Sequence, residues 1–205
     1  VARNEFGTPL VDSAFAEAHR LARHRLLCYI NADIILMDDF ASAVEKVARA
    51  SDNFLMIGQR WDVQLPGIWP FDRQDWQEKL RDYTREHGTL HPRTGIDYFV
   101  FPRGALGKIP PFAVGRPAWD QWLVCHARQR GLAVIDATEM VMAVHQQHNY
   151  DHAGGKHNVW FGPEARQNET LAGSERCTIE DATHLLRADG IYPRYPQGCS
   201  IGKSA

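Results

Sequence analysis

The chain has 205 residues, a formal net charge of −2 at pH 7 and a sequence pI of about 6.6. Because basic residues are not in surplus, the composition argues against nucleic-acid binding and against an anionic membrane surface as partner. No apolar run approaches the roughly 20 residues that a membrane-spanning helix requires, so we expect no membrane span.

The first part of the chain alternates between helical and strand patterns. Apolar residues recur every three or four positions over residues 11–25, which predicts a helix with one buried face. Leu26–Ile30 is a continuous apolar run that predicts a strand buried on both faces. Asp38 and Asp39 are expected N-caps of a second helix, and Phe54–Gly58 is expected to be another buried strand. The order helix, strand, helix, strand is typical of a parallel α/β sheet.

The middle of the chain begins with a change of composition. Residues 63–74 combine prolines and a glycine with aromatic residues, which is typical of a long loop that serves function. A charged helix is expected over Trp76–His87 and a strand over Asp97–Phe101. Pro117 is expected to open a third helix, which Gly131 ends.

The last part of the chain contains shorter apolar runs. Leu132–Ile135 and Thr138–Val144 predict two short strands, and the second ends at His145. Residues 178–188 predict a final helix, whereas the Pro/Gly-rich end from Tyr192 onward is expected to be irregular. Because no repeat or linker interrupts the chain, we expect one domain.

The expected domain covers residues 1–205. Its core is expected in residues 1–155, and residues 156–205 are expected to form the C-terminal helix and an irregular tail. The predicted fold class is α/β, with a sheet flanked by helices.

The cysteines do not form a recognisable framework. Four are scattered without a C-x-x-C pair, at Cys28, Cys125, Cys177 and Cys199. This spacing favours buried free thiols, neither disulfides nor a zinc knuckle, and a reducing compartment. We therefore expect the protein to be cytoplasmic.

Asn31-Ala32-Asp33 follows the first apolar run and is the first candidate site. Ligands in open α/β sheets bind beyond the carboxyl ends of strands, where these side chains are expected. Oxygen ligands of this kind suit Mg²⁺ or Mn²⁺ carrying a diphosphate. The alternative is that Asn31 and Asp33 only cap a turn, and from the local sequence the two interpretations of Asp33 are balanced.

Histidines form the second candidate site. His145, His148 and His152 lie within eight residues, and such a cluster can bind a metal or can simply be a solvated loop. His145 differs from the other two because it ends an apolar strand. Together with Asp33 it would form a mixed nitrogen and oxygen site, not a closed zinc site. A metallohydrolase built on the histidine cluster is a third, weaker hypothesis.

Acidic residues near two further elements form the third candidate site. Asp120 lies in the first turn of the helix after Pro117, where the helix dipole is expected to keep its carboxylate ionised and available to accept a proton. The alternative is an ordinary Asp that complements the dipole. Asp97 and Tyr98 precede an apolar strand and are either a turn or part of a substrate wall.

In their order and spacing these motifs resemble the GT-A fold glycosyltransferases, the nucleotide-diphospho-sugar transferases. Asn31-Ala32-Asp33 resembles the D-x-D motif, His145 the late histidine of the metal site, and Trp119-Asp120 the acidic pair that supplies the base in inverting members. The resemblance covers about residues 1–155 and implies a GT-A-like (Rossmann-like) mixed sheet flanked by helices. It implies the following roles: catalysis by Asp120, binding of Mn²⁺ or Mg²⁺ by Asp33 and His145, donor binding by Asn31, Asp33 and Arg60, and acceptor binding by Asp97, Tyr98 and Trp119.

The chain departs from this family pattern in two ways. Asn31 replaces the first acid of the D-x-D motif, which leaves Asp33 as the main carboxylate. The strand–loop–helix half that grips the nucleotide base is not recognisable, so we expect a missing N-terminal half or a partner domain. The predicted function is metal-dependent transfer of a sugar from a nucleotide-sugar donor to a glycan or small-molecule acceptor. The alternative is a non-catalytic GT-A-like half-domain that binds a glycan or another protein.

Overall fold

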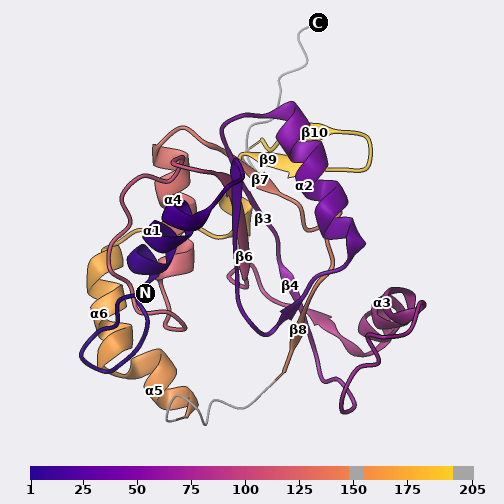
Figure 1. The fold of residues 1–205 in the computed structure, drawn as a ribbon, viewed down its shortest axis with the longest axis horizontal. Coiled ribbons are helices and arrows are strands. Elements are labelled where there is room, and N and C mark those ends of the chain that lie inside the picture. The colour runs from indigo at the N-terminus through magenta and orange to yellow at the C-terminus, as the bar shows by residue number, and fades with distance from the viewer. Residues whose placement is uncertain (148–154, 196–205) are drawn as a thin grey trace, which may run out of the picture.

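A computed structural model describes residues 1–147 and 155–195 of the chain (Figure 1). The protein is α/β, with two mixed sheets flanked by helices. Within the described residues, no helix is long and apolar enough to cross a membrane.

The larger sheet has six strands in the order β1-β6-β3-β7-β9-β10. Their bounds are β1 Leu26–Ile30, β6 Tyr98–Pro102, β3 Phe54–Ile57, β7 Ala133–Asp136, β9 His184–Leu186 and β10 Ile191–Pro193. β3, β7 and β9 run parallel, whereas β6 pairs antiparallel with both β1 and β3. The sheet is therefore mixed, which confirms the α/β fold class with a mixed sheet flanked by helices and corrects the parallel sheet indicated by the alternating pattern of the first part of the chain.

The smaller sheet has four strands in the order β2-β8-β4-β5. Their bounds are β2 Ile34–Ile35, β8 Ala143–Gln146, β4 Arg60–Val63 and β5 Thr89–Leu90. β8 runs parallel to β4 and antiparallel to β2, so it lies between them. This arrangement brings together segments that are far apart in the sequence.

Helices cover both faces of the larger sheet. Their bounds are α1 Val11–Leu21, α2 Asp38–Ala50, α3 Trp76–His87, α4 Trp119–Gln129, α5 Lys156–Phe161 and α6 Pro163–Ala172. Figure 1 shows α1 and α4 on one side of the sheet and α2 on the other, whereas α3 lies beside the smaller sheet. The helix predicted over Trp76–His87 is confirmed.

The central strand β3 explains how the core is divided. All four of its side chains are fully buried. Leu55 and Ile57 belong to the cluster that contains α1 and α4 residues, whereas Phe54 and Met56 belong to the cluster on the α2 side. Alternate side chains of a strand point to opposite faces, so one short apolar run supplies both halves of the core.

Two predictions near the N-terminal part of the sheet need correction. Leu26–Ile30 is a strand, but it lies at one edge of the sheet, and Cys28 and Ile30 are exposed, so it is not buried on both faces. Asp38 and Asp39 are the first residues of α2 and not its N-cap, which is Met37. The side chains of both aspartates pair instead with Arg81 of α3.

The C-terminal part was predicted least well. Residues 178–188 do not form a helix: they contain the 3₁₀ turn Ile179–Asp181 and strand β9. α5 and α6, which precede them, were not predicted, and β10 lies in what was expected to be an irregular tail. The turn and β9 place Ile179 and Leu186 in the core at spacings that a helix would also satisfy.

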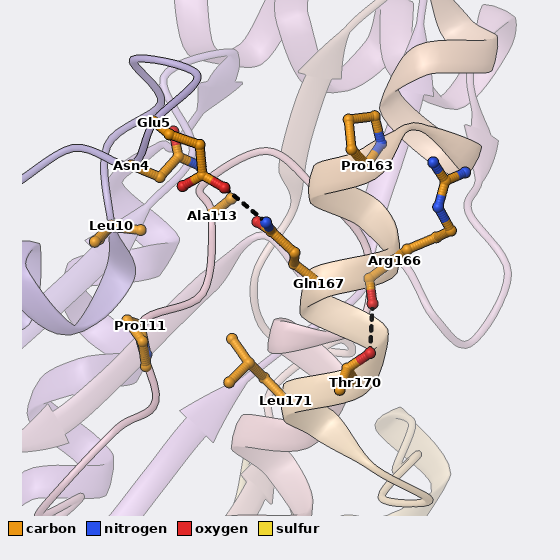
Figure 2. A pocket seen from close by; sticks show the side chains of 10 residues that line it. All are labelled: Asn4, Glu5, Leu10, Pro111, Ala113, Pro163, Arg166, Gln167, Thr170 and Leu171. Carbon is orange, nitrogen blue, oxygen red and sulfur yellow. Dashed lines mark hydrogen bonds between the residues drawn. The ribbon is translucent and has the colours of Figure 1, made fainter.

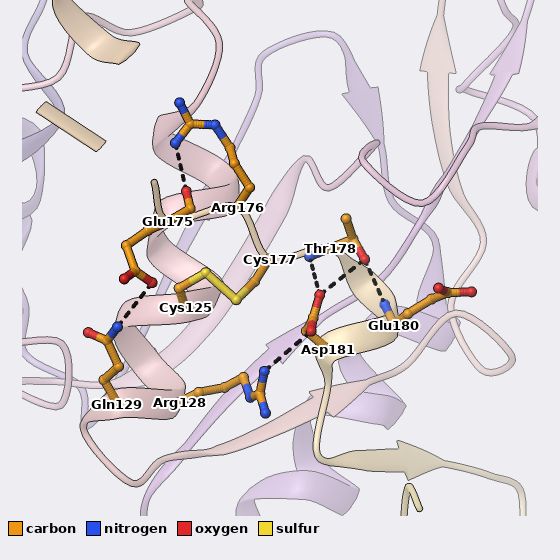
Figure 3. Close-up of a disulfide and its surroundings, with 9 residues drawn as sticks. All are labelled: Cys125, Arg128, Gln129, Glu175, Arg176, Cys177, Thr178, Glu180 and Asp181. Atoms are coloured by element: carbon orange, nitrogen blue, oxygen red, sulfur yellow. Dashed lines mark hydrogen bonds and ion pairs between the residues drawn. A yellow bond between two sulfur atoms is a disulfide. The ribbon is translucent and has the colours of Figure 1, made fainter. Parts of the chain in front are cut away.

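A disulfide between Cys125 and Cys177 contradicts the expected free thiols. Figure 3 shows that it joins α4 to the segment before the 3₁₀ turn. Two contacts support the same junction: Arg128 pairs with Asp181 at 3.3 Å, and Gln129 donates a hydrogen bond to Glu175 at 3.0 Å. The expectation of a reducing compartment therefore loses its support, because it assumed unpaired cysteines.

Candidate functional site

One large cleft contains nearly all of the predicted site residues. Its volume is about 1180 Å³, and it is lined by the β1–β2 turn, both ends of the 91–97 loop, the turn before α4, α5 and the N-terminal loop. The predicted residues that line it are Asn31, Asp33, Arg60, Asp97, Trp119, Asp120 and His145. These residues come from segments that are distant in sequence, and the fold brings them together.

A second pocket of about 680 Å³ lies between the N-terminal loop, the segment around Ala113 and α6. Gln167 donates a hydrogen bond of 2.8 Å to the carboxylate of Glu5 across this pocket (Figure 2). It contains none of the predicted site residues, and its lining is mainly apolar. We therefore place the candidate chemistry in the larger cleft.

Asp33 and His145 meet because of the register of the smaller sheet. Asp33 ends the turn before β2, and β2 pairs with β8 so that Ile34 lies opposite His145. Nε2 of His145 lies 3.4 Å from Oδ2 of Asp33. A divalent cation with ligand bonds of about 2.0–2.6 Å could contact both atoms after small side-chain shifts.

Asp62 orients the imidazole of His145. β4 and β8 are parallel, with Asp62 opposite His145, and Nδ1 of the histidine lies 2.9 Å from Oδ1 of Asp62. A carboxylate at this distance favours the tautomer in which Nδ1–H donates, so Nε2 is the nitrogen that faces Asp33. A carboxylate behind a histidine in this way is typical of metal-ligating histidines.

Asp62 also contacts His91 and Arg60. Its carboxylate lies 2.5 Å from Nδ1 of His91 and 2.9 Å from Nε of Arg60. Burial alone would raise the pKa of Asp62, but the hydrogen bond to His91 and the charge of Arg60 outweigh it and hold the pKa below its usual value. Asp62 and His91 were not predicted as site residues, because their roles depend on strand pairing that the sequence does not reveal.

Asp97 forms the centre of a second polar cluster. It is 5% exposed, and Nη1 of Arg60 lies 2.9 and 3.1 Å from its two oxygens, while the amide of Asn31 donates to it at 2.5 Å. Burial tends to lower the pKa of Arg60, but Asp97 and Asp62 raise it. These contacts fix the turn that carries Asp33. Direct contact of Asn31 or Arg60 with a donor, and of Asp97 with an acceptor, stays a prediction.

Asp120 is half-buried on the cleft wall, in the first turn of α4. Its pKa is raised to about 6, mainly by burial and to a smaller extent by the negative charge of Asp97, and the backbone N–H of Gln121 only partly opposes this. The expected stabilisation of the carboxylate by the helix terminus is therefore outweighed. A carboxyl group with a pKa near 6 is suited to accept a proton at neutral pH.

The backbone just before Asp120 is strained. Ala118 has a φ of 80° and is the one non-glycine residue with positive φ in the ranges that the structure describes. Strained residues persist only where their surroundings hold them, and they occur preferentially at functional sites. This strained residue directly precedes α4 and lies two residues before Asp120.

Two side chains of α6 hold the turn that leads to Asp120. Asn168 is 1% exposed, accepts a hydrogen bond from the N–H of Ala113 and donates to the carbonyls of Ala113 and Pro117. Glu164, which is also buried, pairs with Arg116 at 2.5 Å. Neither residue was predicted, because both belong to a helix that the sequence pattern did not indicate.

Tyr98 lies outside the cleft, and Trp119 lines it but is largely buried. The Tyr98 side chain is fully buried, packs edge-on against Phe40 and does not line the cleft, so its predicted contact with an acceptor is wrong. Trp119 lines the cleft but is only 5% exposed, because its ring packs against Tyr29 and Phe99. It contributes more to the core than to any ligand surface.

The donor set fits Mn²⁺ or Mg²⁺ better than a closed zinc site. In residues 1–147 and 155–195, no group of three or more His, Cys, Asp or Glu side chains is arranged to hold a metal. Mg²⁺ is usually bound by one or two carboxylates together with water and substrate phosphates, so few protein ligands suffice. His148 and His152 of the predicted cluster lie outside the described residues.

Comparison of the chain with protein-family models, with curated proteins and with solved structures gave no match.

Proposed function

We propose that the protein is a metal-dependent glycosyltransferase of the GT-A type, which transfers a sugar from a nucleoside-diphosphate donor to an acceptor hydroxyl. The observation that carries the proposal is the convergence of Asp33, His145 and Asp120 on one cleft large enough for both substrates. Two of them lie 3.4 Å apart with an oriented imidazole, and the third has a pKa near 6.

Asp33 and His145 would hold Mn²⁺ or Mg²⁺, and Asp62 keeps the imidazole in the binding orientation. When bound, the ion would neutralise charge that develops on the diphosphate leaving group. Asn31, Arg60 and the ion site form one side of the cleft, which we assign to the donor.

Asp120 acts as the general base. Its carboxylate accepts the proton of the acceptor hydroxyl while that oxygen attacks the anomeric carbon of the donor sugar. The bond from the anomeric carbon to the diphosphate oxygen breaks, and the nucleoside diphosphate leaves with both electrons of that bond. Attack opposite the leaving group gives inversion. Trp119 and Asp97 shape the cleft wall beside this base.

A cytoplasmic location of the protein stays a prediction.

The proposal is tested by thermal unfolding with Mn²⁺ and a panel of UDP, GDP, ADP and dTDP. A ligand that binds only the native state raises the free energy of unfolding by about 2.7 kcal/mol at a hundredfold excess over Kd. We expect metal-dependent stabilisation by one nucleotide in the wild type and in the control Asp82→Ala, an exposed carboxylate outside the cleft. The stabilisation should be absent in Asp33→Ala and His145→Ala, and equal stabilisation of all four proteins would refute the proposal.

A second candidate is a non-catalytic domain that binds a partner. It is favoured by the edge strand β1, which within the described residues pairs on one side only, with β6. An unpaired edge can accept a strand from a second domain. If no nucleotide binds but a strand-forming partner protects the β1 amides from hydrogen exchange, this candidate replaces the first.

A further inference from the structure

One wall of the cleft carries exposed aromatic side chains that the site described above does not use. Phe6 of the N-terminal loop is 50% exposed, and Trp160 and Phe161 of α5 are 46% and 63% exposed. We call these three residues the aromatic wall. Large aromatic side chains exposed in a concave site are typical of a ligand-binding surface, because a ligand that covers them removes much apolar area from water.

The aromatic wall belongs to the same structural unit as Asp120. α5 is followed directly by α6, and Asn168 of α6 holds the backbone of Ala113 and Pro117, just before α4. The N-terminal loop joins the same unit, because Asn4 donates a hydrogen bond of 2.7 Å to Glu164. The proposed ion ligands, in contrast, are carried by the smaller sheet. The aromatic wall is therefore on the acceptor side of the cleft.

The charged side chains on this side are mostly bound to one another or to the backbone, which favours an uncharged ligand. Arg116 lines the cleft, but Glu164 neutralises it through contacts of 2.5 and 3.0 Å, and both side chains are largely buried. Glu169, which also lines the cleft, is paired with Arg176. Neither pair offers a net charge to a ligand. Arg3 of the N-terminal loop also lines the cleft, and its guanidinium donates a hydrogen bond to the carbonyl of Gly7. We therefore assign recognition mainly to the aromatic rings and to Asp120.

We propose that the aromatic wall binds the acceptor as an uncharged pyranoside, with a C–H face of the sugar ring packed on Trp160 or Phe161 and a hydroxyl directed to Asp120. A pyranose has an apolar C–H face and polar edges, which matches apolar rings beside one proton acceptor. This inference rests on the proposed function, since it names the acceptor class of the same cleft.

Saturation-transfer NMR with a panel of simple glycosides tests the assignment. The probes are methyl β-glucoside, methyl β-galactoside, methyl β-N-acetylglucosaminide and methyl α-mannoside, with glucose 1-phosphate as the charged comparison. We expect at least one methyl glycoside to bind the wild type and to bind Trp160→Ala about tenfold more weakly. Trp160→Phe should restore binding, because it keeps an aromatic face.

Phe71→Ala is the matched control, because Phe71 is 49% exposed but does not line the cleft. It should leave glycoside binding unchanged. Thermal unfolding should show all variants folded, since the replaced side chains are about half exposed or more. The inference is overturned if no methyl glycoside binds the wild type, if Trp160→Ala binds as well as the wild type, or if glucose 1-phosphate binds in preference. It is also overturned if Trp160→Ala changes the oligomeric state of the protein but leaves glycoside binding unchanged.

The nucleotide assay separates this inference from the proposed function. Binding of Mn²⁺ and nucleotide should be unchanged in Trp160→Ala, because the aromatic wall is not on the donor side. Nucleotide binding without glycoside binding would overturn the aromatic wall as acceptor site and leave the donor site intact. Glycoside binding that depends on Trp160, in a protein that binds no nucleotide, would support the sugar site and refute the transferase.

Discussion

The raised pKa of Asp120 predicts that Asp120→Asn stabilises the protein, and does so more at high pH than at low pH. The substitution keeps the shape of the side chain and an oxygen that can accept the N–H of Gln121. It removes the negative charge that burial and Asp97 disfavour. No substrate is needed for this test, so its outcome does not depend on the proposed reaction.

The magnitude follows from the difference between the folded and unfolded pKa values of Asp120. An ordinary aspartate has a pKa of 3.8, and that of Asp120 is about 6. Because the folded state binds the proton more tightly, this group stabilises the fold below pH 3.8, and the stabilisation is lost as the pH rises through 6. One pKa unit corresponds to about 1.4 kcal/mol. Relative to low pH, ionisation of Asp120 therefore lowers the free energy of unfolding by at most about 3 kcal/mol at pH 8 and by about 1.5 kcal/mol at pH 5.

Urea unfolding of the wild type and of Asp120→Asn between pH 5 and pH 8 measures this difference. The free energy of unfolding of the variant should exceed that of the wild type by up to about 3 kcal/mol at pH 8, with a smaller excess at pH 5. A variant that is less stable than the wild type, or an excess that does not change with pH, would refute the reasoning.

Three further predictions concern catalysis, ion binding and the disulfide. Transferase activity, measured as kcat/KM, should fall about tenfold per pH unit below pH 6 as Asp120 takes up a proton; a flat profile down to pH 5 would exclude Asp120 as the base. Asp62→Asn should weaken Mn²⁺ binding in the presence of nucleotide by about tenfold or more, because Asp62 holds the imidazole of His145. The control Asp82→Asn, at an exposed carboxylate, should bind Mn²⁺ like the wild type. Equal Mn²⁺ affinities of the wild type and Asp62→Asn in titration calorimetry would show that Asp62 plays no part. Replacing Cys125 and Cys177 by serine should lower the free energy of unfolding by about 4 kcal/mol, since the bond closes a loop across 52 residues; an unchanged urea midpoint would argue that the bond does not form in solution.

The elements that could be predicted from the sequence are those with a long, consistent pattern. The helix Trp76–His87 has a charged surface and a regular apolar stripe, and its bounds were found. Residues 178–188 have apolar spacings that suit either a helix or a turn followed by a strand, and only the packing of Ile179 and Leu186 decides between them.

The candidate site could be predicted in part, because its residues follow strands or begin helices. Asp33, His145 and Asp120 were found from such positions, whereas Asp62 was missed because its link to His145 depends on the parallel pairing of β4 and β8. Tyr98 was placed wrongly because neighbouring residues of an extended chain point in opposite directions, so a cleft position for Asp97 puts Tyr98 in the core.

The pKa of Asp120 shows a further limit of sequence reasoning. A helix terminus is visible in the sequence and suggests an ionised carboxylate. The burial of Asp120, which has the larger effect on its pKa, and the nearby charge of Asp97 are not visible in the sequence. The disulfide could not be predicted for the same reason, because Cys125 and Cys177 meet only through the packing of α4 against the segment before the 3₁₀ turn. Both depend on contacts between distant segments.

Pulsed electron paramagnetic resonance of Mn²⁺ bound with the preferred nucleoside diphosphate tests the central claim most directly, because it detects nitrogen nuclei in the ligand shell of the ion. The account predicts modulation from one imidazole nitrogen in the wild type, its loss in His145→Ala, and loss of the bound ion in Asp33→Ala. An Mn²⁺ signal without nitrogen modulation in the wild type, or modulation that persists in His145→Ala, would contradict it.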